Sequence, residues 1–108
     1  MKEMAYYFRI ETARNKFVGG GPFGTITKAR KGLISTYVSK YRKKYPHAEL
    51  QIWKDMEFIG NVDYSLDFKK WAWISETSDV SYFINSDGTL NKKISNREWN
   101  VIMGFERR

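Results

Sequence analysis

A 21-residue amphipathic segment that ends at a proline constrains this fold more than any other feature of the sequence. Thr25 is a suitable N-cap for a helix that runs to Tyr45, and Pro46 stops it there. At about 100° per residue, the apolar side chains fall on a single arc roughly 180° wide. The arc holds Ile26, Ala29, Leu33, Ile34, Tyr37, Val38, Tyr41 and Tyr45. A helix of this kind requires another layer of structure to bury that arc.

The segments on either side of the expected helix alternate between apolar and polar residues, which is the period of a half-buried strand. Before the helix, residues 6–11 form one strand, and a short return strand around 17–18 ends where GGGPFG breaks regular structure. After the helix, the expected strands are residues 48–53, 62–68, 71–74, 80–85 and 89–94.

Turn and capping signals separate these strands and begin a second helix. Gly60-Asn61 predicts one hairpin, and the residues from Asn85 to Gly88 predict another. Ser95 and Glu98 form a capping box ahead of a short apolar stripe, which predicts a C-terminal helix ending near Gly104. The expected fold class is therefore α+β, with a strand, a long amphipathic helix, an antiparallel meander of four to five strands and a short final helix.

The length favours a single compact domain over residues 1–108, because two domains would each lack a sufficient core. No apolar run is long enough to span a bilayer, and the charged, alternating N-terminus does not resemble a signal peptide. The absence of cysteine excludes disulfides and thiolate metal sites and fits a reducing compartment. We therefore expect a cytoplasmic protein without membrane contact.

The net charge of +7 is concentrated in one third of the chain. Between Thr12 and Ala48 there are nine cationic residues and no acidic residue, whereas acidic residues slightly outnumber basic ones elsewhere. Such asymmetry bears on the partners of a protein rather than on its fold. On the helix, most of these cations lie opposite the apolar arc. Arg30 is the exception, because it falls inside the arc and must either extend to solvent or pair with a carboxylate.

The cationic helix predicts a small non-enzymatic protein that binds nucleic acid without strong sequence readout, because clustered cations release the counterions of a polyanion. The expected nucleic-acid-binding residues are Lys28, Lys31, Lys40, Arg42, Lys43 and Lys44. The alternative is a protein-binding inhibitor or adaptor, for example from a phage or mobile element, whose basic face meets an acidic protein surface. The sequence does not distinguish DNA from RNA, nor does it give the oligomeric state.

Free backbone N–H groups at the helix start suggest a second anion site, formed by Lys16, Gly24 and Thr25. This segment is not a P-loop, because Thr25 and Ile26 stand where that motif requires Lys and then Ser or Thr.

The sheet face away from the helix is expected to be acidic, which disfavours nucleic acid on that side. If Phe8, Ile10, Leu50, Ile52, Tyr64 and Leu66 pack under the helix, the other face carries Glu11, Glu49, Asp63 and Asp67 beside Tyr7, Arg9 and Trp53.

Catalysis is not predicted, and we assign no catalytic residue, metal ligand or cofactor. A weak alternative is a metal-dependent nuclease using Asp63 and Asp67, but four residues along a strand place their Cα atoms roughly 13 Å apart. His47, the single histidine, is expected in a surface turn. Trp71, Trp73 and Trp99 fit either the core or a partner-binding surface.

Overall fold

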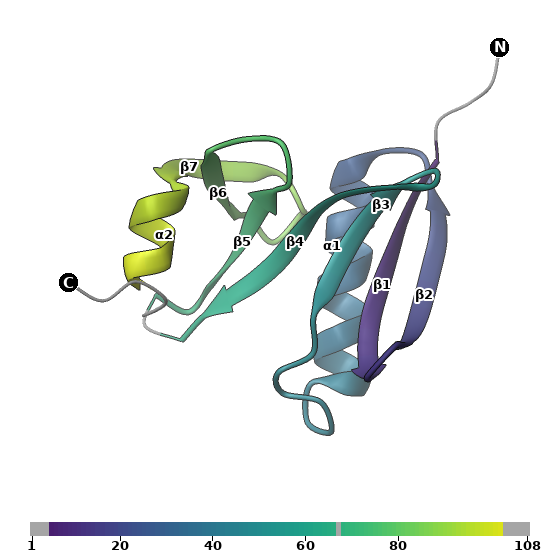
Figure 1. Ribbon diagram of the computed structural model, residues 1–108. Coiled ribbons are helices and arrows are strands. Elements are labelled where there is room, and N and C mark those ends of the chain that lie inside the picture. Colours follow the sequence, from purple (N-terminus) through teal and green to yellow (C-terminus); the bar gives the residue numbers. More distant parts are fainter. Residues whose placement is uncertain (1–4, 67, 103–108) are drawn as a thin grey trace, which may run out of the picture.

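The computed structural model describes residues 5–66 and 68–102 as seven strands and two helical segments (Figure 1). The strands are β1 (Tyr6–Ala13), β2 (Lys16–Phe23), β3 (Leu50–Lys54), β4 (Glu57–Ser65), β5 (Lys70–Ser75), β6 (Val80–Ile84) and β7 (Leu90–Ser95). The helices are α1 (Ile26–Thr36), which continues as the π-helical turn η1 (Tyr37–Tyr41), and α2 (Asn96–Ile102).

All seven strands form one antiparallel sheet in the order β2-β1-β3-β4-β5-β6-β7. The first hairpin places β2 at one edge, and the helix returns the chain so that β3 pairs with the free side of β1. From β3 onwards each strand pairs with the next along the chain. The predicted antiparallel α+β architecture is thus confirmed in outline, although strands dominate and the helix is shorter than expected.

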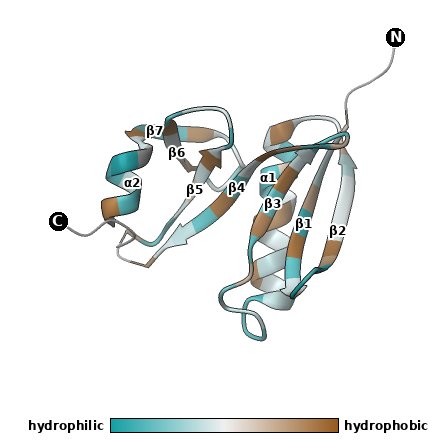
Figure 2. Cartoon of the chain, viewed as in Figure 1, coloured by the Kyte–Doolittle hydropathy of each residue, from teal (hydrophilic) through white to brown (hydrophobic). Residues whose placement is uncertain are grey.

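The two helices lie on opposite faces of the sheet and at opposite ends of it (Figure 1). One core cluster joins Ala29, Leu33 and Tyr37 of the first helix to buried strand residues: Phe8, Ile10, Leu50, Ile52, Val62, Trp73 and Ile84. The other cluster joins Trp99 of α2 to Ala72, Phe83 and Ile94. Hydrophobic and hydrophilic bands accordingly alternate along β1 and β3 (Figure 2), as the period of two requires.

The expectation that the helix reaches Tyr45 is wrong, because helical structure ends at Tyr41. The Thr25 cap is confirmed, since its hydroxyl accepts a hydrogen bond from the Lys28 N–H at 3.2 Å. At the other end, the Arg42 N–H donates to the carbonyl of Tyr37 at 2.8 Å, which closes a wide π-type turn. The Tyr37 hydroxyl donates to the Tyr45 carbonyl at 2.5 Å and holds the chain after the helix.

The glycine-rich segment was expected to interrupt regular structure, and this is wrong as well. Gly19, Gly20 and Gly21 belong to β2, which runs on to Phe23. The Phe8 ring explains one of these glycines, because a Cβ on Gly20 would lie 2.3 Å from it. The sequence of β2 is unusual for a strand, because glycines stand opposite the side chains of β1.

The prediction of a hairpin at Gly60-Asn61 is also wrong, because both residues lie inside β4. The turn lies instead at residues 55–56, where Asp55 takes a φ of 52°. Gly60 is required for packing: a Cβ there would lie 2.6 Å from both the Trp73 ring and the Ile74 carbonyl oxygen. β4 ends at Ser65, so Leu66 does not pack under the helix and is 78% exposed.

The turn between β6 and β7 and the N-terminal cap of α2 are confirmed as predicted. Residues 85–89 connect β6 to β7, and the Gly88 N–H donates to the Asn85 carbonyl at 2.9 Å. The Ser95 hydroxyl accepts a hydrogen bond from the Glu98 N–H at 3.1 Å, which caps α2. The expected end near Gly104 lies outside the described residues. Within those residues, neither helix is long and apolar enough to cross a bilayer.

Candidate functional sites

The outer side of α1 and the residues after it carry five exposed lysines, here called the cationic row: Lys28, Lys31, Lys40, Lys43 and Lys44. Among the described residues, no carboxylate forms an ion pair with any of them. The charge of Lys31 contributes to lowering the pKa of Asp87, but the main cause of that shift is the hydrogen bonds from Thr89. Lys44 Nζ lies 5.6 Å from the centre of the Tyr45 ring. The row therefore presents its positive charge to solvent.

Arg42 differs from the rest of the predicted nucleic-acid-binding set, because it points towards the sheet. Its guanidinium carbon lies 4.6 Å from the centre of the Tyr64 ring and 5.9 Å from that of Trp71. A π turn advances each residue by a smaller angle than an α turn does, so η1 rotates Arg42 from the outer side to the flank. The regular helical wheel could not foresee this rotation. The same change leaves Val38, expected in the apolar arc, 47% exposed.

Arg30 does not reach solvent, and no carboxylate pairs with it among the described residues, so neither expectation for it is confirmed. The side chain is buried, and its Nε donates to the Gly88 carbonyl at 3.0 Å. Its guanidinium carbon lies 5.4 Å from the centre of the Trp73 ring, and Nη2 donates to the Thr27 hydroxyl at 3.4 Å. Burial lowers the pKa of Arg30 from its usual value. Its role is to join α1 to the β6–β7 hairpin.

The second anion site is not assembled as predicted. Lys16 begins β2, whereas Gly24 and Thr25 follow its end, so the length of the strand separates the lysine from the other two. At about 3.3 Å per residue, this separation is roughly 25 Å. The Thr25 hydroxyl is also engaged by the Lys28 N–H.

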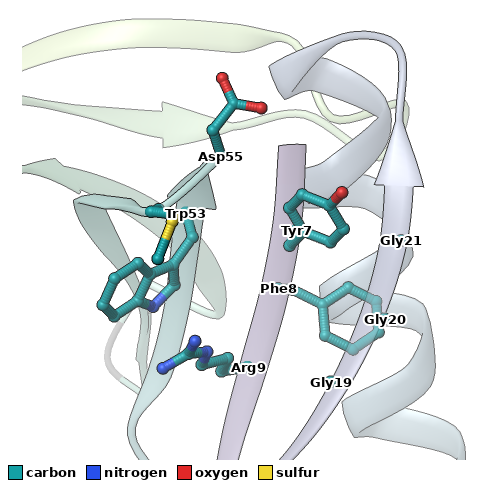
Figure 3. A pocket seen from close by; sticks show the side chains of 9 residues that line it. Tyr7, Phe8, Arg9, Gly19, Gly20, Gly21, Trp53 and Asp55 are labelled. Atoms are coloured by element: carbon teal, nitrogen blue, oxygen red, sulfur yellow. The ribbon is translucent and has the colours of Figure 1, made fainter. Parts of the chain in front are cut away.

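The sheet face opposite α1 contains an open pocket of about 640 Å³. Tyr7, Arg9 and Trp53 form its walls, and the glycines of β2 leave its floor without side chains (Figure 3). The Arg9 guanidinium carbon lies 4.1 Å from the centre of the Trp53 ring. Asp55 and the highly exposed Met56 complete the lining. The face prediction had placed Tyr7, Arg9 and Trp53 together, but it gave no sign of the pocket.

A polar network adjoins this pocket. The Trp53 indole N–H donates to Gln51 Oε1 at 2.9 Å, and the Gln51 amide donates to Glu49 at 2.7 Å. The Asn61 amide donates to the other Glu49 oxygen at 3.2 Å. Two neutral amides therefore donate to one carboxylate, and the hydrogen bond to Gln51 fixes the orientation of Trp53.

Asp63 lies at the end of this network under α2. Burial raises the pKa of Asp63, and the charge of Glu49 raises it further, while the nearby Trp99 indole N–H lowers it. That N–H is buried and lies outside hydrogen-bond geometry to any described acceptor. Asp67, the other carboxylate of the nuclease alternative, lies outside the described residues. Among the described residues, no three His, Asp or Glu side chains gather as a metal site.

The remaining predicted residues have clear positions. Trp73 and Trp99 are buried, and Trp71 is half-buried against Tyr64, with ring centres 4.9 Å apart. His47 is exposed in a turn, as predicted. Comparison of this chain with protein-family models, curated proteins and solved structures finds no match.

Proposed function

We propose that this protein binds the phosphate backbone of nucleic acid through its cationic row, without strong sequence specificity. The observation that carries the proposal is that α1 and the turns after it carry five exposed lysines, with no carboxylate partner among the described residues. Clustered ammonium groups bind a polyanion because they displace its condensed counterions.

The length of the row suits the phosphate backbone of a duplex. Lys28 and Lys40 are twelve residues apart, which at 1.5 Å per residue corresponds to about 18 Å along the helix. This distance spans about five phosphate steps on one strand of a duplex, measured along the duplex axis at 3.4 Å each. An ordinary solvated helix would place acidic residues at i, i+4 from these lysines, but the segment from Thr12 to Ala48 contains none.

The decisive experiment measures the affinity for labelled single-stranded and duplex DNA at several salt concentrations. For five phosphate contacts on a duplex, log K should fall with a slope of about −4.5 against log salt. The double variant Lys31→Glu, Lys43→Glu should abolish binding. The matched control is Lys92→Glu, Arg97→Glu, which makes the same charge change at exposed positions on β7 and α2.

Equal losses in the two double variants would contradict the proposal, because they would show that net charge alone governs affinity. A wild-type protein that does not bind at about 50 mM salt would also contradict it. That second outcome would favour the protein-binding alternative, in which the same lysines meet an acidic protein surface. A pull-down with the wild-type chain and both double variants would then test that alternative.

A further inference from the structure

We propose that the pocket on the open sheet face binds a planar ring ligand that carries an oxyanion at one end and a hydrogen-bond donor at the other. A nucleoside 5′-monophosphate with an exocyclic amino group is the simplest ligand of this kind. This site lies on the opposite face of the sheet from the cationic row and does not depend on the function proposed above.

The pocket exists because Gly19 and Gly21 of β2 lie on the same side of the sheet as Tyr7 and Arg9 and have no side chains to fill the space (Figure 3). Gly19 pairs directly with Arg9, and an added Cβ there would have a single neighbour within 4 Å, the Phe8 carbonyl oxygen at 3.4 Å. The volume of about 640 Å³ falls within the range of small-ligand sites. A side chain at Gly19 would occupy this space without a clash.

Aromatic side chains provide the ring-binding part of the pocket. Tyr7 lies over Gly21 on one side, and Trp53 lies on the other side (Figure 3). Trp53 is held in place by its bond to Gln51 and by the Phe58 ring, whose centre is 5.8 Å away. Fixed, half-exposed rings favour the stacking of a flat ligand, because little side-chain entropy is lost on binding.

Arg9 provides the anion-binding part. Its guanidinium rests on the Trp53 ring, and no carboxylate pairs with it among the described residues. A guanidinium that stacks by its face keeps its N–H edge available, and that edge matches the two oxygens of a phosphate or carboxylate. The site therefore favours an oxyanion at this end.

Asp55 provides the negatively charged end of the pocket, opposite Arg9. Its Oδ1 accepts a hydrogen bond from the Ala5 N–H at 3.3 Å, and no described donor occupies its other oxygen. Ala5 and Arg9 are four residues apart on an extended chain, or roughly 13 Å. This carboxylate repels a second anionic group on the ligand and accepts a hydrogen bond from a donor group. The pocket is thus positive at one end and negative at the other, with the rings between them (Figure 3).

The test is isothermal titration calorimetry with adenosine 5′-monophosphate, supported by amide NMR shifts at Gly19 and Gly21. We expect one site per chain, with adenosine, inorganic phosphate and inosine 5′-monophosphate each binding at least fivefold more weakly. Adenosine lacks the anion, phosphate lacks the ring, and inosine monophosphate lacks the amino donor. Equal binding of the inosine compound would overturn the assignment of Asp55.

Two variants test the location of the site, and two others serve as controls. Gly19→Leu fills the pocket and should weaken binding at least tenfold, and Arg9→Gln should do the same while leaving the fold intact, because Arg9 is exposed. Gly24→Leu is the matched control, since a Cβ at Gly24 meets nothing within 4 Å and lies outside the pocket. The Lys31→Glu, Lys43→Glu variant should bind the nucleotide normally. Absence of binding by the wild type at millimolar nucleotide, or normal binding by Gly19→Leu, would overturn the proposal.

Discussion

The Nε of Arg30 donates a hydrogen bond to the carbonyl oxygen of Gly88 across 58 residues of sequence, at a distance of 3.0 Å. The contact fastens the β6–β7 hairpin to the middle of α1. No carboxylate within residues 5–66 and 68–102 pairs with this buried cation.

Arg30→Ala should destabilise the fold by about 2 to 4 kcal/mol, because it removes a hydrogen bond from a charged donor and leaves a cavity beside Trp73. Urea denaturation followed by tryptophan fluorescence measures the change. A loss below about 0.5 kcal/mol would show that the buried guanidinium contributes no net stability, as can occur when desolvation cancels its contacts.

Gly88→Ala should also destabilise the fold, by at least about 2 kcal/mol. Gly88 has a φ of 89°, and a Cβ there would meet the Thr27 carbonyl oxygen. Gly24→Ala is the control in open space. Because Arg30 and Gly88 share one contact, the double variant should lose less than the sum of the single losses, and additive losses in a double-mutant cycle would contradict this coupling.

Asp63→Asn should raise the melting temperature at neutral pH. The folded-state pKa of Asp63 is raised by burial, so the carboxyl favours folding while protonated. That contribution is fully present below the unfolded pKa of 3.8 and is lost as the pH rises through the raised folded value. Thermal denaturation between pH 3 and pH 8 should therefore show the variant gaining on the wild type as the pH increases. A constant difference across this range would refute the assignment.

Arg42→Lys separates the charge of Arg42 from its stacking. The variant keeps a cation but loses the planar contact with Tyr64, so it should lower stability by about 0.5 to 1 kcal/mol. Affinity for DNA should change less than twofold if the cationic row provides the phosphate contacts. Fluorescence anisotropy and urea denaturation on the same samples provide both measurements. A tenfold loss of affinity would place Arg42 itself in the binding surface.

Local patterns predicted much of this fold because they depend on neighbouring residues. The alternation in β1 and β3, the Thr25 and Ser95 caps and the turn before Gly88 each depend on contacts within a few residues. The failures have distant causes. Gly60 resembles a turn residue in sequence, but Trp73 packs against it from the neighbouring strand.

The candidate sites were predictable to different degrees for the same reason. The exposure of Lys28, Lys31 and Lys43 follows from helical periodicity, whereas Arg42 was misplaced because the sequence gives no sign of the π turn. The pocket was missed because its cause is a lack of side chains on β2, next to rings supplied by β1 and β3. A glycine run beside alternating aromatic residues was the available signal.

The placement of α1 and α2 on opposite faces, at opposite ends, has a consequence for how the molecule meets its surroundings. Each helix covers part of one side, so the lysines of α1 and the pocket beside Trp53 lie on opposite sides of the molecule, with the sheet between them. A ligand bound on either side leaves the other side accessible, so the two sites are occupied independently.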